Sequence, residues 1–170
     1  MNKAVGPVDA SLMPYRLGAG IMLINAEGLI WIGQRRNHFA QDGRNWQMPQ
    51  GGIDKDEAPA AAAIRELAEE TGTDKAEILA ETKDWFQYDL PPDRLGIALK
   101  GKYRGQRQKW FAMRFTGIDA DFNIHNPPGG HQPEFSDWRW ATSVDLPGLI
   151  VPFKREVYQA VIAEFRRYLR

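Results

Sequence analysis

Apolar residues recur along the chain with two periods, which predicts a mixture of strands and helices. Residues 17–25 (LGAGIMLIN) and 29–35 (LIWIGQR) are strand-like, and the turn-forming NAEG lies between them. The Pro- and Gly-rich stretch 125–135 is typical of a loop. Further extended segments are predicted at 45–50, 78–82, 84–90, 109–117 and 137–142.

Two segments have helical spacing instead. The first is predicted to begin near Pro59, which suits a first helical position, and to end before Gly72, which suits a C-cap. The second covers 153–169, where Val157, Val161 and other apolar residues recur every four positions. Strands mixed with two such helices predict an α/β fold, with a mixed sheet covered by helices on both faces.

Length and charge narrow the range of functions. The 170 residues suit one domain, with residues 1–14 loosely ordered. Lys plus Arg and Asp plus Glu both number 22, so bulk charge predicts no affinity for DNA or a membrane. The chain has no cysteine, which excludes disulfides and thiolate metal sites. With no apolar run that suits a signal peptide or a membrane span, a cytoplasmic protein is expected.

The first helix carries an unusual acidic face. At about 100° per residue, Glu66, Glu69 and Glu70 lie together, opposite an apolar face. One interpretation is an ordinary solvated face. Against it, like charges at i and i+4 destabilise a helix, and Arg65 alone does not balance the set. Hard divalent cations such as Mg²⁺ or Mn²⁺ prefer clustered carboxylate oxygens, so a metal site is the alternative. The apolar face is predicted to comprise Ala60, Ile64, Leu67, Ala68 and Thr71.

The residues before this helix fit a ligand site as well. Gly51 and Gly52 end a strand and allow a ligand to approach the backbone closely. Five residues separate Gly51 from Glu57, and seven more separate Glu57 from RELAEETG (65–72). This pattern resembles the signature box of the Nudix hydrolases. The one departure is Thr73, where the family usually has an aliphatic residue.

This resemblance implies an α/β/α sandwich with a mixed sheet. It also implies hydrolysis of a nucleoside diphosphate linked to another group, with Mg²⁺ or Mn²⁺ as cofactor. The three glutamates would be metal ligands, and the position of Glu69 most often serves as general base as well. Arg65 would orient the acids, Glu57 would brace the loop, and Gly51 would offer a backbone carbonyl to metal.

Motifs outside the box resemble one branch of the family. The motifs are WQMPQGGI (46–53), YDLP (88–91), QKWF (108–111), PEF with WRW (133–140) and FKREVY (153–158). They are similar to those of bacterial members that act on the 5′-triphosphate ends of RNA. Close relatives of these enzymes hydrolyse dinucleoside polyphosphates. The resemblance extends from about residue 15 to 167 and leaves both substrates open.

The candidate substrate contacts each have a structural alternative. Phe153 would stack on a base beside Lys154, or else would act as a hydrophobic staple for the last helix. Glu134 would be a further metal ligand or base, or else a solvated loop carboxylate. The basic residues of 100–109 are phosphate contacts or a solvated loop. The remaining candidate contacts are Arg16, Arg35, Arg36, Tyr88 and Lys109, whereas His38, His125 and His131 are interpreted as surface residues.

A different class of function is a nucleotide-binding regulator that has lost catalysis. Such proteins typically lack a glutamate of the box or carry an added DNA-binding segment. Here every acid of the box is present and no helix-turn-helix region remains. The sequence therefore favours an enzyme.

Overall fold

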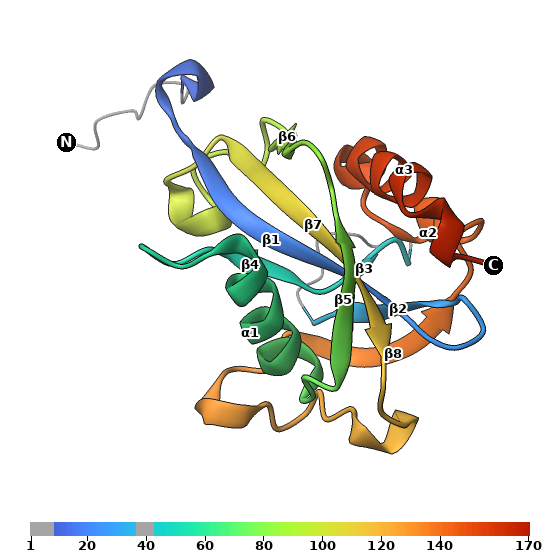
Figure 1. The fold of residues 1–170 in the computed structure, drawn as a ribbon. Coiled ribbons are helices and arrows are strands. Elements are labelled where there is room, and N and C mark those ends of the chain that lie inside the picture. The colour runs from blue at the N-terminus through green and yellow to red at the C-terminus, as the bar shows by residue number, and fades with distance from the viewer. Residues whose placement is uncertain (1–8, 37–42) are drawn as a thin grey trace.

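Within residues 9–36 and 43–170, which the computed structural model describes, eight strands form one mixed sheet (Figure 1). The strands are β1 (Tyr15–Ile24), β2 (Ile30–Arg35), β3 (Trp46–Gln47), β4 (Gln50–Gly52), β5 (Ala76–Glu81), β6 (Phe86–Asp89), β7 (Gly105–Phe115) and β8 (Phe135–Ala141). The helices are α1 (Pro59–Thr71), α2 (Leu146–Leu149) and α3 (Arg155–Glu164), with 3₁₀ turns at Ala10–Leu12, Ala98–Gly101, Asp119–Asp121, Pro128–Gly130, Pro152–Lys154 and Arg166–Tyr168.

The centre of the sheet is the parallel pair β1 and β7, in register from Tyr15 with Gly105 to Ile24 with Arg114. The other side of β1 is shared by β4, which pairs over Gly18–Gly20, and β2, which pairs at Ile24. The far side of β7 is shared by β5 and β6. Because β4 is short and pairs with β1, its other edge is available to side chains from α1.

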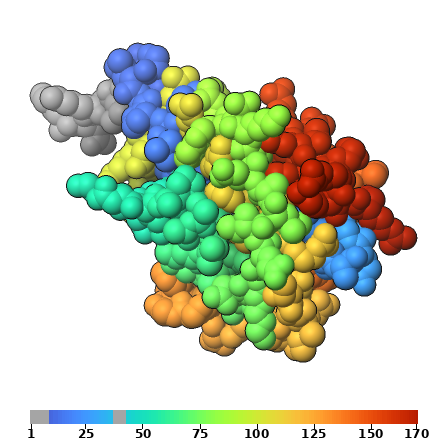
Figure 2. Space-filling view, viewed as in Figure 1, coloured from blue at the N-terminus to red at the C-terminus, as the bar shows by residue number. Residues whose placement is uncertain are grey.

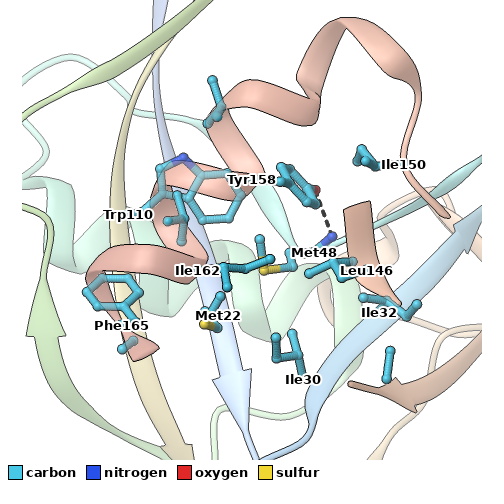
Figure 3. Close-up of a cluster of buried hydrophobic side chains, with 14 of the residues drawn as sticks. Met22, Ile30, Ile32, Met48, Trp110, Leu146, Ile150, Tyr158, Ile162 and Phe165 are labelled. Atoms are coloured by element: carbon cyan, nitrogen blue, oxygen red, sulfur yellow. Dashed lines mark hydrogen bonds between the residues drawn. The ribbon is translucent and has the colours of Figure 1, made fainter. Parts of the chain in front are cut away.

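Strand alternation divides the core into two layers. Ile21, Leu23 and Phe111 face α1, whereas Met22 and Trp110 face α3. Figure 3 shows the second layer, in which the Tyr158 hydroxyl accepts a hydrogen bond of 2.9 Å from the Met48 backbone N–H. A sheet with helices packed on both faces confirms the predicted α/β/α sandwich with a mixed sheet.

The ends of α1 match the prediction. Pro59 occupies the first turn, and Gly72 closes the helix with φ of 84° while its N–H donates to Ala68 O. The last helix is shorter than predicted, because Phe165 leaves helical geometry and residues 166–168 form a 3₁₀ turn. The helix α2 was not predicted, and β7 begins at residue 105 rather than 109. Of the N-terminal segment predicted to be loosely ordered, residues 1–8 lie outside the described residues and 10–12 form a 3₁₀ turn.

The predicted apolar face of α1 was wrong at one position. Ile64 is 44% exposed, whereas the buried residues are Ala62, Ala63, Leu67 and Thr71. Because the side chains of Ala62 and Ala63 are small, the helix packs close to the sheet. The helix face that carries Glu66 and Glu70 then lies against β4. In Figures 1 and 2 the loop between β4 and α1 (53–58) projects from the molecule beside this helix.

Candidate active site

Arg65 ties the acidic residues of α1 to the preceding loop. Its guanidinium donates to both carboxylate oxygens of Glu57 at 2.9 Å, to Glu66 at 2.9 Å and to Glu69 at 3.2 Å. It also donates to the backbone carbonyl of Gly52 at 2.8 Å. One cation therefore bonds three carboxylates and the end of β4, an arrangement that suits the orienting role predicted for Arg65.

Glu57 closes the loop that leads into α1. Its carboxylate accepts the Asp54 backbone N–H at 3.0 Å as well as the two bonds from Arg65. These bonds, chiefly those from Arg65, lower the pKa of Glu57 to about 2, and the pairing raises the pKa of Arg65. Glu57 thus remains ionised, in a position that suits the bracing role predicted for it.

Glu66 and Glu70 lie against β4. A Cβ atom on Gly51 would come within 2.0 Å of the Glu66 carboxyl carbon, so only glycine leaves room for this carboxylate. Glu70 accepts the backbone N–H of Gln50 at 3.1 Å. Burial raises the pKa of both carboxyls, most strongly that of Glu70, which the charges of Glu134 and Glu66 raise further. The two acids are therefore crowded and deprived of solvent.

This environment fits a divalent metal ion. The available donors are hard carboxylate oxygens, the ligands that Mg²⁺ and Mn²⁺ prefer. Among the described residues no group of three acidic or histidine side chains is preformed as a metal site, because Arg65 takes up Glu66 and Glu69. Glu66, Glu69 and Glu70 are the residues that would hold the ion. When bound, it would neutralise phosphate oxygens and lower the pKa of water.

Glu134 approaches the cluster from the segment before β8. Its side chain is 41% exposed, and one carboxylate oxygen lies 3.7 Å from Arg35 Nε. Its charge is the largest electrostatic contribution to the raised pKa of Glu70. Glu134 is thus near the acidic site, which is the arrangement expected of a further ligand or base.

A cavity of about 310 Å³, here called the Phe153 cavity, opens beside β4. The Phe153 ring lies 5.6 Å from the Tyr88 ring, and the Arg94 guanidinium lies 4.8 Å above it. Arg35 contributes a buried Nε that has no hydrogen-bond partner among the described residues. The lining combines aromatic, apolar and cationic groups: Arg35, Gln50, Tyr88, Leu90, Arg94, Ile97, Ala98, Leu99, Gln106, Phe153 and Lys154.

Lys154 is a buried cation in this lining. Its ammonium donates to Gln47 Oε1 at 3.2 Å and lies 5.7 Å from the Tyr88 ring centre. Burial, reinforced by the Arg35 charge, lowers the pKa of Lys154 to about 7. The Tyr88 hydroxyl accepts from Gln106 at 2.7 Å, while burial raises its pKa to about 12. The cavity therefore presents cationic groups beside aromatic rings.

A second cavity, here called the Lys100 cavity, has a volume of about 540 Å³. Arg16 packs over Gly52, where a Cβ atom would lie 2.5 Å from its guanidinium. Leu99 belongs to the walls of both cavities. The lining consists of Tyr15, Arg16, Leu17, Gly52, Ile53, Asp54, Leu99, Lys100, Lys102 and Tyr103.

Two predicted substrate contacts do not join either cavity. Lys109 follows the strand alternation of Phe111, away from Gln106 and Gln108, and its ammonium donates to Lys83 O at 3.1 Å. Arg36 is exposed just beyond β2, and its backbone N–H donates to Glu134 O at 3.1 Å. Lys109 faces away from both cavities because side chains alternate between the two faces of a strand. Its closeness in sequence to the basic residues of 100–107 does not decide its direction.

The sequence interpretation missed one residue near the acids. His131 Nε2 lies 3.3 Å from Glu69 Oε1, although its side chain is 50% exposed. His131 and Glu69 are far apart in sequence and no helical or strand spacing relates them, so no signal was available. His125 is exposed as expected, and His38 lies outside the described residues.

Among residues 9–36 and 43–170, no helix has the length and apolar character needed to cross a membrane.

The chain is 55% identical to the RNA pyrophosphohydrolase of Brucella anthropi over 170 residues, which cover 98% of each chain. It is 54% identical to the RNA pyrophosphohydrolase of Brucella ovis over 174 residues, again 98% of each.

Solved structures share the fold at low identity. The dihydroneopterin triphosphate pyrophosphohydrolase of E. coli superposes with a TM-score of 0.62 at 14% identity, covering 89% of this chain and 99% of the other. The Ap4A hydrolase of C. elegans in a binary complex gives 0.58 at 15% identity, covering 88% and 98%. Residues 14–161 match the sequence pattern of the NUDIX domain. Because this match covers most of the chain, the chain belongs to the Nudix family.

Proposed function

We propose that this protein removes pyrophosphate from the 5′-triphosphate end of RNA, and so initiates degradation of the transcript. The observation that carries the proposal is the 55% identity, over nearly the whole chain, to an RNA pyrophosphohydrolase. It is supported by the Phe153 cavity of about 310 Å³, which has aromatic and cationic walls. Gln50 lines this cavity and donates its backbone N–H to Glu70. A base and its phosphates match that lining.

In the proposed reaction, water attacks a phosphorus atom of the triphosphate, a P–O anhydride bond breaks, and pyrophosphate leaves. Divalent metal, Mg²⁺ or Mn²⁺, would supply charge neutralisation and an acidified water. Glu69 would accept the proton of that water, while Arg65 and Glu57 hold the helix and the loop in position. Glu134 would act as a further ligand or base, and the Gly51 carbonyl as a backbone ligand.

The substrate would be held on the other side of β4. Phe153 and Tyr88 would contact a base, and Arg35 and Lys154 would contact phosphate or a base edge. Arg16, whose positive charge acts against the rise that burial causes in the pKa of Glu66, would meet the polyphosphate beside the metal. Base stacking tolerates different sequences, which suits an enzyme that acts on many transcripts.

A second candidate is hydrolysis of dinucleoside polyphosphates such as diadenosine tetraphosphate. One observation favours it: the Lys100 cavity offers space beyond Leu99 for a group at the far end of a polyphosphate. A non-catalytic regulator is a weaker explanation, because the box acids are all present and Arg65 bonds three of them, Glu57, Glu66 and Glu69.

The deciding experiment compares kcat/KM on a 5′-triphosphorylated RNA and on diadenosine tetraphosphate, with Mg²⁺ and with Mn²⁺. We expect the higher value on RNA, with pyrophosphate as product and no turnover when metal is chelated. The same RNA with a 5′-monophosphate serves as the control and releases nothing. Turnover of neither substrate would favour the regulator, and a higher value on diadenosine tetraphosphate would favour the second candidate.

A further inference from the structure

In the proposed reaction on RNA, the Lys100 cavity has no role apart from that of Arg16 at its edge. It is larger than the Phe153 cavity, about 540 Å³ against about 310 Å³. Strand β4 links the two, because Gln50 lines one and Gly52 lines the other. Two residues along a strand correspond to about 7 Å, so a single extended ligand can reach both cavities.

Positive charge dominates the lining. Arg16, Lys100 and Lys102 face a single carboxylate, that of Asp54. Neither lysine forms an ion pair with any residue that the structure describes. Asp54 lies 3.6 Å from the Arg65 guanidinium and is therefore partly neutralised already. The cavity presents a net positive surface next to the acidic site.

The remaining lining is aromatic and apolar. Tyr103 is half-buried in the wall beside Leu17 and Ile53. Tyr15 is less available, because its hydroxyl donates to Asp89 at 2.7 Å and the Arg104 guanidinium covers its ring at 4.8 Å. An aromatic face beside cations is a lining that suits a base with its phosphate.

The backbone holds this wall in a strained form. Leu99 and Lys100 have φ of 54° and 59°, a left-handed conformation that residues with a Cβ rarely adopt. Gly101 and Gly96 lie so close that a Cβ on Gly101 would come within 2.6 Å of the Gly96 carbonyl oxygen. This geometry places Leu99 between the cavities and Lys100 in the second one. Strain of this kind is concentrated at binding sites.

We propose that the Lys100 cavity is a second nucleotide subsite, in which Lys100, Lys102 and Arg16 bind phosphate and Tyr103 stacks on a base. This inference rests on the proposed function, since it assumes that the substrate carries more than one nucleotide. The nucleotide has two possible sources with the same chemistry. It is the far nucleotide of a dinucleoside polyphosphate, or a downstream nucleotide of an RNA.

The test removes the two lysines and leaves Arg16 in place. For Lys100→Ala with Lys102→Ala, we expect KM for a substrate with two nucleotides to rise about 3- to 30-fold, the range for two exposed charge contacts. The inhibition constant of adenosine triphosphate, which has one nucleotide, should change by less than about twofold. A matched variant, Lys75→Ala with Lys83→Ala, removes equal charge outside the cavity and should leave both values unchanged.

Tyr103 gives an independent measurement. Tyr103→Ala should raise KM by about 5- to 100-fold, as expected for loss of one stacked base, and Tyr103→Phe should restore it. A rise in KM for diadenosine tetraphosphate alone would assign the cavity to the far nucleotide. A rise in KM for triphosphorylated RNA alone would assign it to a downstream nucleotide.

Unchanged KM on both substrates would overturn the subsite, as would an equal shift in the inhibition constant of adenosine triphosphate. Because wild-type turnover is measured in the same series, failure of the proposed function is seen separately, as a wild-type protein that hydrolyses neither substrate.

Discussion

Glu70 and Lys154 are buried groups of opposite charge, and each lies among charges of its own sign. Glu70 accepts one backbone hydrogen bond, while burial and the nearby acids Glu134 and Glu66 raise its pKa. Lys154 donates to Gln47, while burial and Arg35 lower its pKa to about 7. No ion pair joins Glu70 to Lys154 among the described residues. Carboxylates thus gather on one side of β4 and cationic groups on the other.

A metal–polyphosphate complex would suit both regions, since the metal would meet the acids and the phosphates would meet the cations. The two regions differ in how they are built. The acidic region comes from one helix and the loop before it, held by Arg65. The Phe153 cavity is assembled from β2, β4, β6, β7, the segment 90–99 and the turn before α3. The predictions below probe each region in turn.

The largest effect is expected in the acidic region. Glu69→Gln should lower kcat on triphosphorylated RNA by about 10²- to 10⁴-fold, the contribution of a positioned general base. The melting temperature should move by less than about 2 °C, because an i,i+4 charge pair contributes only a few tenths of a kcal/mol. Steady-state kinetics and thermal melts check this. Glu77→Gln, on exposed β5, is the control, and a wild-type rate would remove Glu69 from the mechanism.

Metal binding should depend on the two crowded acids. Mg²⁺ or Mn²⁺ at 100 times its dissociation constant should stabilise the protein by about 2.7 kcal/mol, which corresponds to roughly 5–10 °C in Tm. Glu66→Ala with Glu70→Ala should erase that shift. Glu77→Ala with Glu81→Ala removes equal charge from β5 and should keep it. An undiminished shift in the first variant would place the metal elsewhere.

The aromatic wall of the Phe153 cavity should matter for RNA in particular. Phe153→Ala should reduce kcat/KM on triphosphorylated RNA by about 5- to 100-fold, the range given by one stacked base. A nucleoside triphosphate, which lacks a second base, should lose less. Phe153→Leu preserves apolar packing and serves as the matched control for folding. Equal losses on both substrates together with a lower Tm would favour the staple interpretation instead.

The last prediction concerns the pH dependence that the buried Lys154 gives to stability. Because the pKa of Lys154 falls from 10.5 to about 7 on folding, the unfolded chain binds one more proton between these pH values. This group therefore makes the free energy of unfolding rise with pH, by up to about 1.4 kcal/mol per unit. Relative to Lys154→Met, the wild type should gain stability from pH 7 to pH 9 in urea unfolding. A constant difference would mean that Lys154 keeps its ordinary pKa.

The sequence determined the parts of this protein that depend on neighbours along the chain. Helix α1, its start at Pro59 and its end at Gly72 follow from local sequence signals, and the contact of Arg65 with Glu69 follows from i,i+4 helical spacing. The mixture of strands with two helices likewise predicted a sheet covered on both sides.

Tertiary structure decided which distant side chains meet. The contact of His131 with Glu69 depends on a loop path, and the burial of Lys154 depends on how α3 packs. Neither carries a periodic signal, because each results from packing between elements far apart in sequence. The acidic site could therefore be predicted from the order of residues, whereas the cavities beside it required the folded chain.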